Sequence, residues 1–247
     1  MSRFLTLSPT PDVRDYWIAA VTFVGIAVCF SVDTMVTHRQ QVVLGIGGWI
    51  CLLGLLKGED TLTRTQVGIA VLFATIGEHF ASPYMEGYTY RFGDVSDFVP
   101  PGHGMVYLTA VALGRSGFFK QFRSHILVFV LIVGSLWSIW GVTLAQREDE
   151  IGALLFFVFV MFVFFGRSPM VYLGAFFITT WVELIGTYLG TWNWAVVDPA
   201  SGLSQGNPPS GVAAWYCLVD AVAISMAPKV MQSYLWLNER YRLLFQN

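Results

Sequence analysis

The sequence predicts an all-α, polytopic membrane helix bundle of about eight spans, built as two parallel four-helix repeats with both termini cytoplasmic. Three observations indicate this: few charged residues, long uncharged apolar runs, and a self-similarity between the two halves of the chain. Of the 247 residues, 55% are hydrophobic and only 12% are charged, whereas soluble domains have about 25% charged residues. The net charge of -2 and the lack of a basic stripe argue against nucleic-acid binding.

Eight charge-poor runs come near the length of about 20 residues that a helix needs to cross the hydrocarbon core. In chain order they are 15–33, 41–57, 65–84, 103–118, 124–145, 150–167, 169–189 and 211–231. The fourth is the weakest, because only Met105 to Gly114 is plainly apolar. Lipid offers the backbone no hydrogen-bond partner, so continuous apolar runs predict helices and not strands.

Positive charge orients these spans. If the N-terminus, every second connection and the C-terminus share one side, that side holds eleven of the fourteen Lys and Arg residues. The eleven are Arg3, Arg14, Lys57, Arg64, Arg115, Lys120, Arg123, Arg167, Lys229, Arg240 and Arg242. The other side holds only Arg39, Arg91 and Arg147. Because the cytoplasmic side attracts Lys and Arg, both termini are expected in the cytoplasm. The membrane itself is expected to be a bacterial cytoplasmic membrane.

An internal repeat relates a first half, 1–118, to a second half, 119–247. The matched features are Glu78 and Glu183, Pro100 and Pro208, Tyr107 and Trp215, and the aromatic segments 87–90 and 190–194. They recur in the same order with a nearly constant shift in residue number. Since each half has four spans, both halves enter and leave the membrane on the same side. The duplication is therefore predicted to be parallel, unlike the inverted repeats of many transporters.

Three carboxyl groups are predicted at a similar depth in the outer half of the membrane. At about 1.5 Å per residue, Glu78 and Glu183 lie about 20 Å above the inner ends of their helices. Asp220 descends about 14 Å from the outer end of its helix. An ionisable group at such a depth is costly and normally faces a cavity or a partner. These three residues are candidate catalytic groups, and a purely structural role is the alternative.

Two histidines distinguish the first half from the second. His79 follows Glu78, and His103 follows the double proline, where the second half has Leu184 and Gly211. Such asymmetry suits a reaction in which one group donates a proton and another accepts it, so both histidines are candidate catalytic residues. No metal is predicted, because the spacing of these residues lacks a metal-binding helix motif, and no cofactor is predicted either.

Aromatic side chains gather at the same level and are candidate substrate-binding residues. They are Tyr88, Tyr90, Tyr107, Trp192, Trp194 and Trp215, joined by Asn207. Asn207 belongs to the second of two long loops, about 85–102 and 190–210, which are expected on the non-cytoplasmic side. An interfacial belt of Trp and Tyr is the structural alternative. The functional interpretation is a cage of π faces, each of which stabilises cationic charge by about 0.5–2 kcal/mol. Protonation of a polyene beside an acid requires such a cage.

Part of the second half resembles membrane carotenoid-biosynthesis enzymes of the 1,2-hydratase type. The residues are Glu183-Leu-Ile-Gly186, Leu189-Gly190-Thr-Trp192-Asn-Trp194, Pro208 and Trp215. Glu78 and the segment 87–90 repeat this pattern loosely. The family usually has tyrosine where Trp192 and Trp194 stand, and the double proline also departs from its pattern. The resemblance implies acid-catalysed addition to, or cyclisation of, an isoprenoid chain, with Glu183 and Glu78 as acids.

Three functions follow as hypotheses. The first is an enzyme that acts by acid/base chemistry on a lipophilic, isoprenoid-like substrate, in an outward-opening cavity between the two repeats. The second is a carrier or channel for a small solute or a proton, which would use the same carboxyl groups. The third is a non-catalytic subunit of a membrane complex. The expected partners are the lipid bilayer and a lipophilic small molecule, and a homo-oligomer or a membrane complex stays open.

Overall fold

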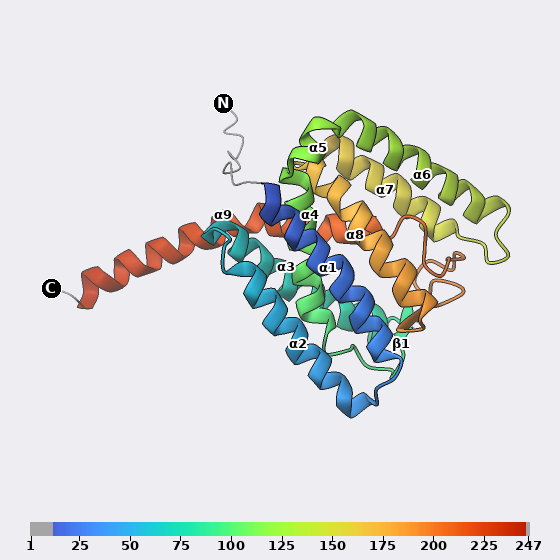
Figure 1. The fold of residues 1–247 in the computed structure, drawn as a ribbon, viewed down its shortest axis with the longest axis horizontal. Helices are drawn as coiled ribbons and strands as arrows, with labels where there is room; N and C mark the ends of the chain where they lie inside the picture. The colour runs from blue at the N-terminus through green and yellow to red at the C-terminus, as the bar shows by residue number, and fades with distance from the viewer. Residues whose placement is uncertain (1–11, 246–247) are drawn as a thin grey trace.

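The computed structural model describes residues 12–245, which form a bundle of α-helices (Figure 1). In chain order its elements are α1 (Asp12–Asp33), α2 (His38–Leu56), α3 (Thr61–His79), η1 (Phe80–Tyr84), β1 (Tyr88–Tyr90), α4 (Val99–Arg115), α5 (Gly117–Gln121), α6 (Arg123–Thr143), α7 (Glu150–Phe165), α8 (Pro169–Tyr188), β2 (Trp192–Trp194) and α9 (Ala213–Phe245). The ends of the two predicted repeats, 1–11 and 246–247, lie outside the described residues. The predicted all-α class is confirmed.

Five helices are long and apolar enough to cross a membrane. They are Val13–Asp33, His38–Leu56, Arg123–Thr143, Pro169–Tyr188 and Ala213–Asn238. The three remaining predicted runs also fall on helices, namely α3, α4 and α7, and α7 is a shorter apolar helix. The structure thus supports a membrane protein, while the total of eight spans and the parallel repeats stay predictions.

The helices α4 and α8 form the centre of the bundle. α4 packs against α8, α3 and α1, and α8 also packs against α9 and α7. A Cβ atom at Gly174 of α8 would lie 2.5 Å from the carbonyl oxygen of Ala110, so the absence of a side chain lets the two backbones approach closely. Most residues of α4 are buried. A helix covered by protein needs little lipid-facing apolar surface, which explains the weakness of the fourth predicted run.

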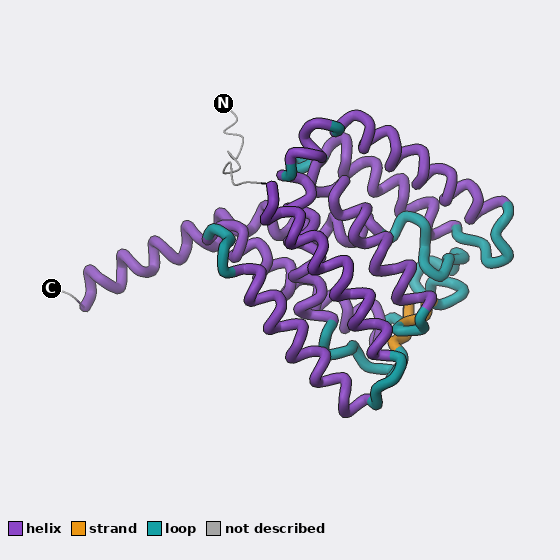
Figure 2. The backbone as a smooth tube through the Cα atoms, in the orientation of Figure 1, coloured by secondary structure: helices purple, strands orange, loops and turns teal. Residues whose placement is uncertain are grey.

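The two long loops meet as a small antiparallel sheet (Figure 2). Tyr88 pairs with Trp194, Thr89 with Asn193, and Tyr90 with Trp192. The sequence did not predict these strands, because each has only three residues and their partners lie about a hundred positions apart in the chain. The pairing places the two matched aromatic segments directly beside each other.

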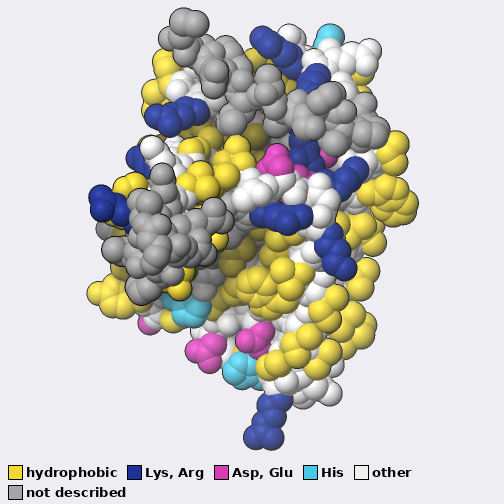
Figure 3. Space-filling view, turned by 90° about the vertical axis from the view of Figure 1, so that its left-hand side faces the viewer, with side chains coloured by type: hydrophobic (Ala, Val, Ile, Leu, Met, Phe, Trp, Pro, Cys, Tyr) yellow, Lys and Arg dark blue, Asp and Glu magenta, His cyan; other side chains and the backbone are white. Residues whose placement is uncertain are grey.

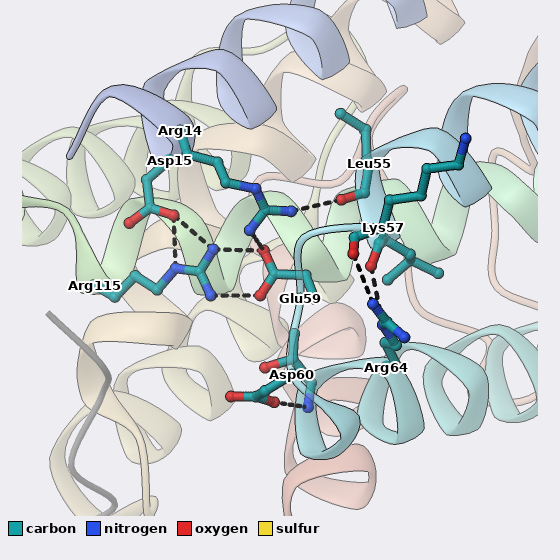
Figure 4. A network of polar contacts seen from close by, with 10 residues as sticks. Arg14, Asp15, Leu55, Lys57, Glu59, Asp60, Arg64 and Arg115 are labelled. Carbon is teal, nitrogen blue, oxygen red and sulfur yellow. Dashed lines mark hydrogen bonds and ion pairs between the residues drawn. The ribbon is translucent and has the colours of Figure 1, made fainter. Parts of the chain in front are cut away.

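The start of α1, the α2–α3 connection and the end of α4 meet at one end of the bundle (Figure 4). Arg115 donates hydrogen bonds to both carboxylate oxygens of Glu59, at 2.6 and 2.7 Å, and to Asp15 at 2.6 Å. Arg14 donates to Glu59 at 2.5 Å. The alternation of the predicted spans requires these segments to share one side. Arg3, assigned to the same side, lies outside the described residues.

Hydrophobic side chains cover a broad part of the face shown in Figure 3, and most of its Lys and Arg side chains gather in the upper part. This separation is typical of a protein whose flanks contact lipid. The last helix, α9, continues to Phe245, beyond the predicted end of the eighth span at 231, and contains Pro228. Its C-terminal part projects away from the bundle (Figure 1).

Candidate functional site

A cavity of about 800 Å³ lies within the bundle. Helices α1, α2, α3, α4, α7, α8 and α9 and both strands contribute to its wall, and most of the lining side chains are apolar. Glu78, His103, Glu183 and Tyr216 also lie in this wall. The volume falls in the range of about 300–1,000 Å³ that is common for small-molecule sites. A largely apolar cavity with a few converging polar groups is the best candidate for the functional site.

Glu78, at the end of α3, accepts three short hydrogen bonds. The phenol groups of Tyr88 and Tyr90 donate to its Oε2 atom at 2.5 and 2.6 Å. The Nε2 atom of His103 lies 2.7 Å from its Oε1 atom. Both carboxylate oxygens are therefore engaged, and the side chain of Glu78 is held between β1 and α4.

The chain after α3 explains how two tyrosines reach one carboxylate. A π-helical turn, η1, follows α3, and Glu86 adopts a positive φ of 57° before the strand begins. Side chains two residues apart on a strand point to the same face, so Tyr88 and Tyr90 point together towards Glu78 while Thr89 is exposed. Burial, followed by the nearby Glu78 carboxylate, raises the pKa of both tyrosines well above its ordinary value. Both phenols therefore stay protonated and act as donors.

Glu183, near the end of α8, has a matching but different set of donors. The indole nitrogens of Trp192 and Trp194 each lie 3.1 Å from its Oε2 atom. The hydroxyl group of Tyr216 lies 3.5 Å from its Oε1 atom. Because an indole can only donate, this carboxyl group is surrounded by neutral donors. Glu183 itself is only 4% exposed.

The two glutamate clusters share one layer of aromatic rings. The ring centroids of Tyr88 and Trp194 are 4.6 Å apart, and those of Tyr90 and Trp192 are 6.1 Å apart. The His103 ring stacks on Tyr216 at 5.4 Å. Each partner of Glu78 thus contacts an aromatic partner of Glu183. This arrangement brings most of the predicted site residues together.

Three residues that were predicted to belong to the site have other positions or contacts in the structure. His79 points away from the carboxyl groups, because its Nδ1 atom lies 2.8 Å from the carbonyl oxygen of Thr75 and its side chain is exposed. Trp215 lines the cavity but is 52% exposed. Asn207 acts on the backbone: its Oδ1 atom accepts a hydrogen bond from the backbone amide of Trp194 at 3.0 Å. Asn207 therefore helps to hold β2.

Asp220 and Tyr107 are buried away from the glutamates. Both are almost fully buried, at 2% and 1% exposure, and neither is among the residues that line the cavity. The Oδ2 atom of Asp220 and the hydroxyl group of Tyr107 have no hydrogen-bond partner among the described residues. Asp220 and Tyr107 therefore do not belong to the cavity wall that holds Glu78 and Glu183.

Two charged residues that sequence reasoning missed hold the second long loop. Arg147 donates to the carbonyl oxygens of Trp194, Ala195 and Gln205 at 2.6 to 2.7 Å. Asp149 accepts from the backbone amides of Gly152, Gly206 and Ser210 at 2.7 to 3.0 Å. A signal was available, because Arg147 is one of only three basic residues assigned to the non-cytoplasmic side.

A metal ion would need a cluster of ligands beyond the Glu78–His103 pair. Among the side chains that the structure describes, no group of three or more His, Cys, Asp or Glu residues is placed to hold one. Comparison with known proteins found no matching family model, no matching curated protein and no matching solved structure. The function therefore has to be inferred from the geometry and chemistry of the site.

Proposed function

We propose that the protein is an integral membrane enzyme that performs acid/base chemistry on a lipophilic substrate in this cavity. The observation that supports the proposal is the pair of buried carboxyl groups in the wall of one apolar cavity, each with its own set of donors. The resemblance described above makes an isoprenoid-like chain the proposed substrate class. The cavity is proposed to lie between two duplicated halves and to open towards the non-cytoplasmic side.

The different donors of the glutamates suggest different roles. Glu78 pairs with a histidine, so this dyad can accept a proton and share it between two basic groups. Among the described residues, the carboxyl group of Glu183 accepts from the neutral groups of Trp192, Trp194 and Tyr216. A buried carboxyl group without a cationic partner favours its neutral form, which makes Glu183 the proposed proton donor.

In the proposed reaction, Glu183 transfers its proton to one carbon of a carbon–carbon double bond. The π electrons of that bond form the new C–H bond and leave a cation on the neighbouring carbon. Nearby ring faces stabilise that cation. It then loses a proton from an adjacent carbon to the Glu78–His103 pair, or it gains water, whose excess proton goes to the same pair. Proton exchange with solvent restores both glutamates.

A common geometry of the two clusters supports the proposed duplication. Glu78 accepts from residues 10 and 12 positions later, and Glu183 from residues 9 and 11 positions later. The strands that supply these donors pair in antiparallel fashion. Two copies related by an approximate two-fold axis would pair in this way. The proposed parallel repeats are related by such an axis, which would lie near the membrane normal.

The test is a mass-spectrometric comparison of lipid extracts from cells that express the protein or its variants. The single variants Glu78→Gln and Glu183→Gln are expected to lose a lipid product that differs from its precursor by one water or by isomerisation. Glu148→Gln, a change at an exposed loop residue, is the matched control and should retain the product. Unfolding temperatures should be recorded for each variant. Unchanged product in both folded glutamate variants would refute the assignment.

A second candidate function is proton or small-solute transport. Asp220 favours it, because a buried carboxyl group in the interior of a membrane bundle is often part of an ion pathway. Flux measured in proteoliposomes should then depend on Asp220 and on both glutamates. Flux that persists in the variant with both glutamates neutralised would argue against a translocation site at the cavity.

A further inference from the structure

Three exposed glycines leave the cavity wall open towards the outside of the bundle. Gly25 of α1, Gly47 of α2 and Gly77 of α3 all line the cavity, and a Cβ atom built at any of them would meet no neighbouring atom within 4 Å. The bundle also contains glycines of the opposite kind. At Gly104, a Cβ atom would lie 2.6 Å from a side-chain carbon of Leu52. The packing of helices explains Gly104 but does not explain the three wall glycines.

Backbone conformation does not explain the wall glycines either. All three lie inside α-helices, where glycine is less favourable than alanine. What they provide is space, since any side chain at these positions would project into or beside the cavity. The open wall is therefore a feature of the cavity and not of helix packing.

The open wall faces the surroundings of the helices. Among the lining residues of these helices, Val28 of α1 is 56% exposed and Val43 of α2 is 68% exposed. Gly25 and Gly47 lie near the middle of helices that are long and apolar enough to span a membrane. At that depth the surroundings of a membrane protein are hydrocarbon and not water. The cavity is thus continuous with a lipid-facing surface.

We infer that the cavity takes its ligand sideways from the bilayer, through the wall that Gly25, Gly47 and Gly77 keep open. The ligand class is a membrane-dissolved lipid with a slender apolar chain, whose reactive part reaches the glutamates while the rest of the chain lies along the apolar wall. This inference rests on the proposed function for the identity of the site, but its test measures occupancy and needs no turnover.

The test uses a C15 isoprenyl alcohol that carries a diazirine, dissolved in liposomes that contain the full chain. After irradiation, mass spectrometry quantifies crosslinks to the peptide that contains Tyr88 and Tyr90, deep in the cavity wall. Gly47→Leu and Gly77→Leu are expected to weaken this labelling about tenfold, because a leucine side chain fills the space that the probe must cross. Gly25→Leu is an independent third variant.

Matched controls lie on the same two helices. Gly54 of α2 and Gly68 of α3 also have open space around them, but neither lines the cavity. Gly54→Leu and Gly68→Leu should label like the wild-type protein. The inference would be overturned if Gly25→Leu, Gly47→Leu and Gly77→Leu all retained full labelling. Equally strong labelling of the same peptide by a water-soluble diazirine would also overturn it.

Two results separate this inference from the proposed function. If Glu78→Gln and Glu183→Gln keep the product while Gly47→Leu and Gly77→Leu weaken labelling, the proposed chemistry fails and lateral entry stands. If the product depends on the glutamates but the three glycine-to-leucine variants are labelled as strongly as the wild-type protein, lateral entry fails and the chemistry stands. Neither result can be mistaken for the other, since labelling reports occupancy and the lipid extract reports turnover.

Discussion

At the scale of single residues, the two glutamates differ chiefly in the donors that surround them. Glu78 has two phenols and an imidazole at 2.5 to 2.7 Å, whereas Glu183 has two indoles and a more distant phenol. Short hydrogen bonds to an ionised group are the strong ones. The donors of Glu78 are therefore expected to matter for stability as well as for chemistry.

Tyr90 offers a direct measurement of this contribution. Tyr90→Phe keeps the ring but removes the donor that lies 2.6 Å from Glu78, so a loss of about 1.5–3 kcal/mol of unfolding free energy is expected. Tyr84→Phe is the control, because Tyr84 is 76% exposed and an exposed change usually alters stability by less than about 0.5 kcal/mol. The unfolding temperature in detergent measures both. Equal values for the two variants would contradict the assigned strength of the Tyr90 bond.

The residue scale also shows what the sequence can predict about the site. Glu78, Glu183 and the aromatic residues of the two loops were predicted to gather, because the same polar and aromatic types recur in order in both halves. Which of the two neighbours, Glu78 or His79, faces the other site residues could not be predicted as firmly from the sequence. It depends on the rotation of the last turn of α3, where His79 reaches back to Thr75.

At the scale of elements, the second long loop depends on two charged residues just before α7, Arg147 and Asp149. Asp149 is 3% exposed and accepts three backbone amides, including those of Gly206 and Ser210 in the loop. Arg147 holds the other end of the loop through the carbonyl oxygens of Trp194 and Ala195. The position of β2, and with it the donors of Glu183, follows from this clamp.

Asp149→Ala should therefore destabilise the protein strongly. It leaves three amides without their acceptor, and each unpaired buried donor costs about 1–3 kcal/mol. A total of about 3 kcal/mol corresponds to a drop of roughly 6–12 °C in unfolding temperature. Asp198→Ala is the control, since the Asp198 carboxylate accepts from Ser201 in an exposed turn. If the two variants melt at the same temperature, Asp149 does not hold the loop.

Elements also differ in how far local sequence determines them. The long helices follow from continuous apolar runs, and their observed ends lie within a few residues of the predicted ones at most positions. The strands β1 and β2 form only because two distant loops meet, so no local pattern indicates them. The extension of α9 beyond 231 is also not indicated by a local pattern, because polar and charged residues alternate there with apolar ones and no continuous apolar run marks the end.

At the scale of the whole molecule, an ion network joins three parts of the chain at one end of the bundle (Figure 4). Burial by itself would raise the pKa of Glu59, but the hydrogen bonds and charge of Arg115, with the charge of Arg14, outweigh it. The pKa of Glu59 therefore lies below its ordinary value of 4.5. The folded chain binds this proton less readily than the unfolded chain does.

The direction of the pH effect follows from that difference. The stabilisation from Glu59 is fully present above pH 4.5 and is lost as the pH falls through the lower pKa of the folded state. The unfolding temperature of the wild-type protein should therefore fall between pH 7 and about pH 3. Glu59→Gln should show a smaller fall over the same range, because a glutamine has no proton to gain.

At pH 7 the same variant should be less stable than the wild type. Arg115 would keep its buried charge but lose its bidentate carboxylate, and breaking such a pair costs about 3–5 kcal/mol. Asp94→Asn, at an exposed loop residue, is the control and should keep the wild-type pH profile. Because the network links α1, the α2–α3 connection and α4, its loss should loosen this end of the bundle. A Glu59→Gln protein with the full acid sensitivity of the wild type would show that other carboxyl groups cause the effect.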